Sequence, residues 1–302
     1  MISGEVLVAG GAMTVLAVAV AYVLGWANKT FHVEVDPRVE AAVAALPGAN
    51  CGGCGYVGCS EYAEAVVLKG EQVTKCTVGG ASVATALAGL MGVEVGESWP
   101  YRAVVHCGAT TAQRLQRREY RGEQSCGAAN MISGIQGCTY GCLGLGDCVA
   151  ACKFGAIHVC DGLATVDYER CTGCGACVRA CPRHIITMVP FKAERMLVVK
   201  CSNKDTGKDV TSVCTVGCIG CGICARTNKL LQIDSGLAGI DYDQYDPATA
   251  DFATVLSKCP RESLVWVGKP TPRDLAAVAD EKLPDRVEAD FKTTVDDAEW
   301  RG

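Results

Sequence analysis

The chain has 302 residues, with 21 cysteines and 35 glycines but only five phenylalanines, and its formal net charge is −5. This composition suggests several small domains in which bound metal replaces part of the apolar core. Repeated Cys-x2-Cys runs in a chain this long favour metal over the disulfides of short secreted scaffolds, and the lack of an extended basic tract argues against a nucleic-acid partner.

The N-terminal segment predicts a membrane anchor over residues 1–28. The segment from Val6 to Trp26 contains no charged residue, and it is long enough for one helix to cross a bilayer. A cleaved signal peptide is the alternative, but Met-Ile-Ser-Gly-Glu at the start contains no Lys or Arg. The nearest basic residues, Lys29 and Arg38, follow the apolar run, so the positive-inside rule puts the rest of the chain in the cytoplasm, as a single-pass protein of the cell (inner) membrane.

Residues 35–95 predict a small α-helical iron-sulfur domain. Apolar residues recur at helical spacing over 36–46, 61–68 and 81–91. Four cysteines lie between these helices, three in a tight run and the fourth farther along the chain: Cys51, Cys54, Cys59 and Cys76. We expect all four to bind one [4Fe-4S] cluster.

Residues 101–137 form a predicted connecting region. Within it, 110–120 predicts a helix with four arginines on one face: Arg114, Arg117, Arg118 and Arg121. This face is either simply solvated or a docking surface for an acidic electron-transfer partner, because complementary charge speeds encounter.

The remainder contains an internal repeat. Cys138-Thr-Tyr-Gly-Cys142-Leu-Gly returns 76 positions later as Cys214-Thr-Val-Gly-Cys218-Ile-Gly. The segments Leu163-Ala-Thr-Val-Asp-Tyr168, Cys181-Pro-Arg and Val105-His-Cys107 also return, as Leu237-Ala-Gly-Ile-Asp-Tyr242, Cys259-Pro-Arg and Val199-Lys-Cys201. We expect a two-cluster ferredoxin-like module over 138–192 and a degenerate one-cluster module over 193–268, each with a short β-hairpin, the first turning at Asp161-Gly162. The fold class is therefore α+β: a transmembrane helix, a small helical domain and two tandem modules.

The cysteine run that starts at Cys171 matches the bacterial ferredoxin signature, in which the fourth cysteine of each run binds the other cluster. This rule assigns one cluster to Cys152, Cys171, Cys174 and Cys177. It assigns the other to Cys138, Cys142, Cys148 and Cys181, with Cys138 the weakest member because its counterpart Cys214 is spare. In the second copy Asn228 and Tyr245 replace two ligands of one cluster, and the surviving set is Cys218, Cys221, Cys224 and Cys259.

Four clusters are therefore expected, with room for a fifth. Zinc is the alternative for any single Cys-x2-Cys pair, but repeated runs with two Cys-Pro fourth ligands favour iron-sulfur. Cys107, Cys126, Cys160, Cys201 and Cys214 remain. They are either buried structural thiols, or all of them except Cys160 together hold a further cluster between the copies. The four histidines have no ligand spacing, and the charged tail over 269–302 is expected to be flexible or partner-bound.

The combined motifs resemble one family, the B subunit of the Rnf complex, a membrane-bound ion-translocating ferredoxin:NAD oxidoreductase. The resemblance rests on the anchor followed by Leu46-Pro-Gly-Ala-Asn-Cys51-Gly-Gly-Cys54-Gly, Gly141-Cys142-Leu-Gly-Leu-Gly-Asp-Cys148-Val and Lys200-Cys201-Ser-Asn-Lys-Asp, and it extends to about residue 267. The segment from Cys51 to Cys76 also resembles the iron-sulfur domain of corrinoid proteins. The lost cluster of the second copy departs from longer family members.

The resemblance implies a subunit that takes electrons from soluble reduced ferredoxin and relays them to other Rnf-type membrane subunits, including one that binds flavin or NAD. The uncharged anchor offers no ion ligand, and the chain has no Gly-rich nucleotide fingerprint, so ion pumping and NAD binding would belong to partner subunits and no complete active site lies in this chain. Two alternatives remain: a membrane subunit that reduces a redox sensor, and a non-catalytic iron-sulfur sensor.

Overall fold

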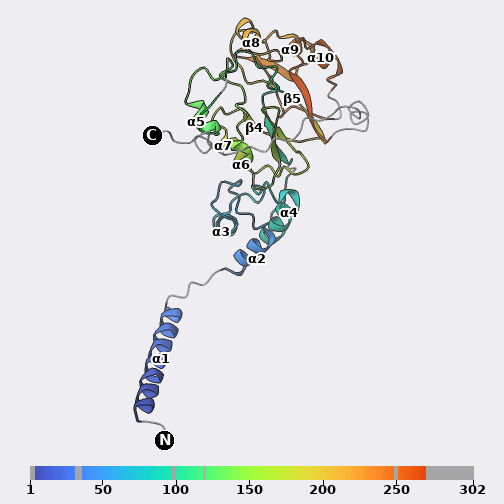
Figure 1. Cartoon of the computed structure of the whole chain (residues 1–302). Helices are drawn as coiled ribbons and strands as arrows, with labels where there is room; N and C mark the ends of the chain where they lie inside the picture. Colours follow the sequence, from blue (N-terminus) through green and yellow to red (C-terminus); the bar gives the residue numbers. More distant parts are fainter. Residues whose placement is uncertain (1–3, 31–35, 97–98, 119, 248–250, 270–302) are drawn as a thin grey trace, which may run out of the picture.

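The computed structural model describes residues 4–30, 36–96, 99–118, 120–247 and 251–269. The chain begins with a long apolar helix, α1 (Gly4–Thr30), which stands apart from the rest of the protein (Figure 1). Within the described residues, α1 is the one helix long and apolar enough to cross a membrane, and none of its apolar window is buried against the protein. Its length and exposure agree with the predicted anchor.

A three-helix domain follows α1. Helices α2 (Pro37–Ala45), α3 (Cys59–Lys69) and α4 (Gly80–Met91) pack around the fully buried side chains of Tyr62 and Leu87. Asp36 caps α2 by accepting a hydrogen bond from the Arg38 amide at 2.9 Å. The three helices predicted in this region are therefore confirmed, and the loop between α2 and α3 carries the first cysteines.

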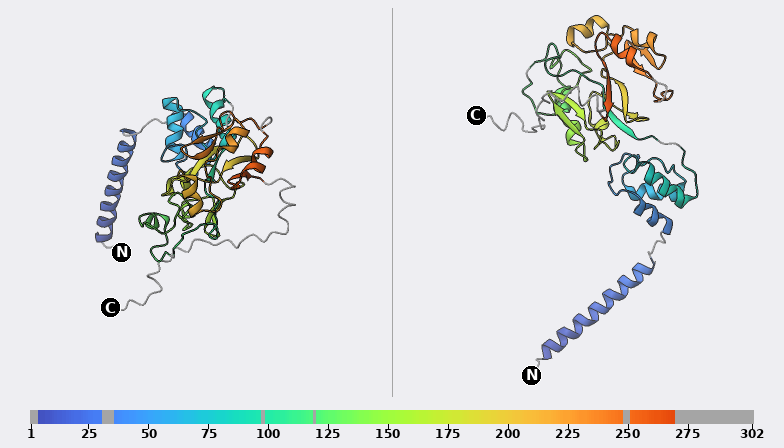
Figure 2. Two further views of the ribbon diagram at one scale, coloured as in Figure 1. Left: turned by 90° about the horizontal axis from the view of Figure 1, so that it is seen from above. Right: turned by 90° about the vertical axis from the view of Figure 1, so that its right-hand side faces the viewer.

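The rest of the described chain contains the same arrangement twice. In the first repeat unit, β1 (Tyr101–Val105) pairs antiparallel with β4 (Ile186–Pro190), and β2 (Ile157–Cys160) pairs with β3 (Leu163–Val166). In the second repeat unit, β5 (Arg195–Val199) pairs with β8 (Leu264–Gly268), and β6 (Leu231–Asp234) pairs with β7 (Leu237–Ile240). The two units lie side by side, beyond the three-helix domain (Figure 2). The start of the predicted connecting region is thus a sheet strand of the first unit.

Short helices complete the two units. The first contains α5 (Cys126–Asn130), α6 (Asp147–Ala150) and α7 (Ala176–Ala180). The second contains α8 (Gly207–Val213), α9 (Ile223–Thr227) and α10 (Ala253–Lys258). The core of the first unit includes several cysteines among its buried apolar side chains. Several of the sulfurs that could hold metal in this unit are therefore part of its core.

Each cysteine loop is fixed against the hairpin of its own unit. The predicted turn at Asp161-Gly162 is confirmed, with φ angles of 44° and 71°. A Cβ added at Gly144 would overlap the carbonyl of Gly162, and one at Gly220 would overlap the carbonyl of Gly236 in the second unit. Glycine is required at both positions because the loop backbone lies directly against the hairpin turn.

The helix predicted over 110–120 is wrong. Residues 111–116 form turns whose backbone pairs with the second unit: Leu115 N donates to Val213 O at 3.0 Å, and Arg114 forms a β-bridge with Cys214. Arg114 is only 6% exposed, so the four arginines do not share a solvated or partner-facing surface. Tertiary pairing replaced the local helical preference. The predicted tail lies outside the described residues from position 270 onward.

Candidate iron-sulfur centres

The three-helix domain gathers its four cysteines into one group, here called the N-terminal quartet: Cys51, Cys54, Cys59 and Cys76. Cys76 is close enough to the other three to interact with each electrostatically. Asn50 shapes the loop, since its side-chain oxygen accepts from the Cys59 amide at 2.8 Å where α3 begins. The Gly79 amide points at the Cys76 sulfur at 3.4 Å, as amide donors around cluster sulfurs do. The structure thus brings together the set that the sequence predicted.

The ferredoxin signature forms a second group with the end of the preceding run. Cys177, on α7, interacts electrostatically with the other three members of this signature quartet: Cys152, Cys171 and Cys174. The Ala156 amide lies 3.4 Å from the Cys152 sulfur. This grouping also matches the sequence prediction.

The third group differs from its prediction by one member. The cavity lined by Cys142, Cys148 and Cys181 is completed by Cys126 and not by Cys138. The predicted set of Cys138, Cys142, Cys148 and Cys181 is therefore not the set that the fold brings together, and the loop quartet is defined here as Cys126, Cys142, Cys148 and Cys181.

Asp147 explains why Cys126 reaches this cavity. Its carboxylate accepts hydrogen bonds from the amides of Cys126 at 2.7 Å and Gly127 at 2.9 Å, which ties the start of α5 to the start of α6 beside Cys148. At the 76-residue offset of the repeat, Leu145 aligns with the ligand Cys221 of the second unit. The cysteine run of the first unit therefore lacks one ligand, which must come from elsewhere in the chain. The sequence contained this signal. It also contained the reason to leave Cys138 out of the set, because Cys138 aligns with Cys214, which is not a ligand of the second-unit cluster.

The second unit keeps a regular group, the second-unit quartet of Cys218, Cys221, Cys224 and Cys259, which lines one cavity as predicted. Burial acts to raise the pKa of the Cys259 thiol, but the amides of Arg261, Ser263 and Leu264 and the Ser263 hydroxyl outweigh it and lower the pKa. These donors would stabilise the thiolate, which is the form that binds metal.

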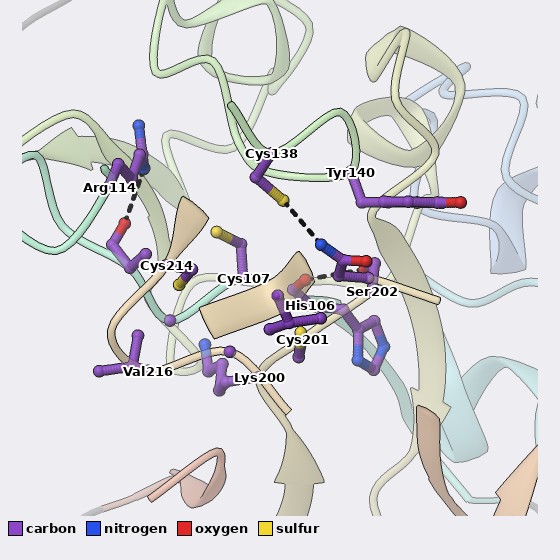
Figure 3. A pocket seen from close by; sticks show the side chains of 15 residues that line it. His106, Cys107, Arg114, Cys138, Tyr140, Lys200, Cys201, Ser202, Cys214 and Val216 are labelled. Carbon is purple, nitrogen blue, oxygen red and sulfur yellow. Dashed lines mark hydrogen bonds between the residues drawn. The ribbon is translucent and has the colours of Figure 1, made fainter. Parts of the chain in front are cut away.

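A further cavity contains four cysteines at the junction of the two units (Figure 3). This junction quartet is Cys107, Cys138, Cys201 and Cys214. Three of its members belong to the predicted further set, and Cys138 takes the place of Cys126. Cys160, at the end of β2, lines none of these cavities.

The cavities are suited to a group larger than one ion. The junction, loop and second-unit cavities are each lined by four cysteines. Among the described residues, no three or more His, Cys, Asp or Glu side chains are grouped as a single metal ion requires. Four thiols around an interior space, with backbone amides aimed at the sulfurs, match the ligand chemistry of a cubane cluster.

Burial makes three of the cavity thiols hold their protons when no metal is bound. It raises the pKa of Cys142 to about 11 and that of Cys201 to about 11, and it also raises the pKa of Cys148. Because the thiolate is the ligand, metal binding must release these protons. Cluster insertion is therefore coupled to deprotonation of core cysteines.

Two family models match the chain at these groups. Residues 46–78, which contain the N-terminal quartet, match a model described as "Putative Fe-S cluster", and residues 164–187, which contain the signature run, match "4Fe-4S binding domain". With the membrane-length helix, the fold and sites define a membrane iron-sulfur electron-transfer protein.

Curated relatives show to which family of such proteins the chain belongs. The chain is 44% identical to the B subunit of the Na+-translocating ferredoxin:NAD+ oxidoreductase complex of Acetobacterium woodii, over 79% of this chain and 72% of that protein. It is 39% identical to the B subunit of the ion-translocating oxidoreductase complex of Methanosarcina acetivorans (82% and 94% covered). It is 40% identical to the B subunit of the proton-translocating ferredoxin:NAD+ oxidoreductase complex of Clostridium ljungdahlii (82% and 88% covered). The chain belongs to the family of Rnf complex B subunits.

Proposed function

We propose that this chain takes electrons from reduced ferredoxin and relays them through [4Fe-4S] clusters to partner subunits of an ion-translocating ferredoxin:NAD oxidoreductase. The names of the relatives support the reaction. The observation that carries the relay is the adjacency of successive cysteine groups. A bound [4Fe-4S] cluster supplies a one-electron couple, and the protein's part is to position the clusters and set their surroundings.

The first contact in this series is between the three-helix domain and the first unit. A Cβ at Gly53, between two N-terminal quartet cysteines, would lie 3.0 Å from the carbonyl oxygen of Cys174. The second contact is within the first unit, where Cys148 of the loop quartet interacts electrostatically with Cys177 of the signature quartet. Three candidate clusters therefore follow one another from the anchor side of the protein.

The ligand assignments of the proposal follow the four groups. The N-terminal, signature and second-unit quartets keep their expected members, and the loop quartet takes Cys126 in place of Cys138. The two repeat units are proposed as tandem ferredoxin-like modules, the second reduced to one cluster of its own.

The proposal places the clusters in the cytoplasm with α1 as the membrane anchor, and it leaves ion translocation and NAD binding to partner subunits. From Val6 to Trp26 the sequence has no charged side chain that could bind a transported ion. The partners include a flavin- or NAD-binding subunit and soluble reduced ferredoxin.

The first test is metal content. Iron, acid-labile sulfide and zinc are measured on the anaerobically purified full-length chain, where four clusters require at least about sixteen irons with matching sulfide. Rapid mixing with reduced ferredoxin should then produce the spectrum of reduced clusters. Stoichiometric zinc with little sulfide, or clusters that reduced ferredoxin does not reduce, would overturn the proposal.

A further inference from the structure

The junction quartet lies outside the four groups of the proposed relay, and it is the most symmetric of the cysteine groups. Each repeat unit contributes the same two positions. Cys107 and Cys201 follow the equivalent strands β1 and β5, and Cys138 and Cys214 begin the equivalent Cys-Thr-x-Gly-Cys loops. The cavity therefore forms where the two units pair. Thiols that served only as core side chains would not need to occupy equivalent positions in both units.

An equivalent arginine in each unit supports the loop of that unit. Arg183 donates to the carbonyls of Cys138 and Gly141, and Arg261, its counterpart in the second Cys-Pro-Arg segment, donates to the carbonyls of Cys214 and Gly217. Two junction cysteines are thus held by equivalent backbone contacts.

Hydrogen bonds between the units fix the walls of the cavity. Thr215 N donates to Gln113 O at 3.1 Å, and Ser202 Oγ donates to His106 O at 2.8 Å. A ring nitrogen of His106 lies 2.7 Å from Val199 O. These bonds flank the junction cysteines on both units, so the four sulfurs are held in place before any ligand binds.

The electrostatics of the cavity favour an anion. Arg114 and Lys200 line it, and none of its lining residues in the described chain is Asp or Glu. Arg114 is 94% buried, and its Nη1 atom has no hydrogen-bond partner among the described residues. A buried cation without a counter-charge is costly, and a cluster held by four thiolates would supply that charge.

The side chain of Asn203 provides a specific contact to sulfur. It is 2% exposed, and its Nδ2 atom lies 3.5 Å from the Cys138 sulfur, drawn as a dashed line in Figure 3. Donors to cluster sulfurs are one means by which proteins set the reduction potential.

The junction quartet also lies next to both the loop quartet and the second-unit quartet. Cys107 interacts electrostatically with Cys142 of the loop quartet, and Cys201 interacts with Cys218 of the second-unit quartet. The order of groups through the protein is then N-terminal, signature, loop, junction and second-unit quartet.

We propose that Cys107, Cys138, Cys201 and Cys214 bind a fifth [4Fe-4S] cluster, which bridges the two repeat units and completes a single series of five. The inference rests on the proposed function. In each transfer one electron leaves a reduced cluster and reduces its neighbour, no bond to protein or substrate changes, and reduced ferredoxin is the electron source.

The test compares the full-length protein with the double variant Cys107→Ser/Cys201→Ser, using Cys160→Ser as the matched control. The wild-type protein and the control should each contain about twenty irons, and the double variant about sixteen. Low-temperature EPR and Mössbauer spectra of the double variant should lack the signal of one cluster and retain the other four.

The outcomes separate this inference from the function on which it rests. About sixteen irons in the wild-type protein, unchanged in the double variant, would overturn the fifth cluster and leave the relay intact. Stoichiometric zinc in place of iron and sulfide would overturn both.

A milder variant covers the case in which the double variant does not fold. Asn203→Asp keeps the side-chain oxygen that accepts from Asp205 N at 2.7 Å but replaces the donor to Cys138 with a negative charge. The iron content should stay at about twenty, and the midpoint potential of one cluster should fall while the other four stay unchanged. Five unshifted potentials would contradict the proposal.

Discussion

At the scale of single residues, the ligand sets depend on which cysteine reaches which cavity, and spacing along the chain does not decide this. Cys138 precedes Cys142 by only four residues, yet Cys126 is the residue that lies beside Cys142. The cause is the Asp147 carboxylate, which holds the Cys126 amide from 21 positions away. Two neighbouring cysteines in one motif can therefore belong to different clusters.

The assignment of cysteines to cavities predicts which single cysteine variants change the EPR signal of the same cluster. Cys126→Ser and Cys148→Ser should perturb the same cluster, because both residues line the loop cavity. Cys138→Ser and Cys214→Ser should both perturb a different one. The measurement is EPR on the reduced single variants, with iron content falling by at most about four per chain. If Cys138→Ser matched Cys148→Ser instead, the grouping predicted from cysteine spacing would be right.

The arginine that follows Cys-Pro should stabilise its cysteine loop. Arg183→Gln removes donors to the Cys138 and Gly141 carbonyls, and hydrogen bonds from a charged donor contribute about 2 kcal/mol. We expect faster loss of cluster absorbance on heating. Arg179→Gln, at an exposed position on α7, is the control and should behave like the wild-type protein. Equal rates for both variants would show that the loop does not depend on Arg183.

At the scale of elements, each unit consists of short pieces whose positions are set by close backbone contact. The strands have four or five residues and the helices between four and seven, which is too short for stability in isolation. The loop-to-hairpin contact at Gly144 and Gly220 is one place where these pieces meet without an intervening side chain.

A glycine pair tests this contact. Both Gly144 and Gly134 have positive φ, 76° and 82°, so alanine at either position costs roughly 1–2 kcal/mol of backbone strain. Only at Gly144 does the added Cβ also meet the backbone of Gly162, whereas Gly134 is open. Gly144→Ala should therefore lose about 1–3 kcal/mol more stability than Gly134→Ala, measured as thermal cluster loss. Equal losses would mean that the loop can move away from the hairpin.

At the scale of the whole molecule, the anchor and the cluster-bearing part are separate structures. None of the apolar window of α1 is buried by the rest of the protein, and the three-helix domain has its own core. The two repeat units contact each other through backbone pairing at the junction, including the Arg114–Cys214 bridge and the bond from Leu115 N to Val213 O.

Removal of residues 1–30 should therefore release the protein from membranes without loss of clusters. The truncated chain is expected in the soluble fraction after cell lysis, with the same iron and sulfide per chain as the detergent-purified full-length protein. Retention of the truncated chain in membranes when partner subunits are absent, or a loss of iron, would show that α1 does more than anchor.

The sequence by itself determined the chemistry and the repeat. The uncharged N-terminal run predicted the anchor, and apolar periodicity predicted the three helices. Cysteine spacing, the Cys-Pro fourth ligands and the internal repeat were enough to predict the hairpins and three of the four quartets as the structure groups them. Only the tertiary structure decided the exchange of Cys126 and Cys138, the loss of the 110–120 helix and the junction cavity. The reason is physical: these features depend on backbone pairing and hydrogen bonds between segments distant in the chain, and contacts of that kind override local propensity without leaving a periodic signal in the sequence.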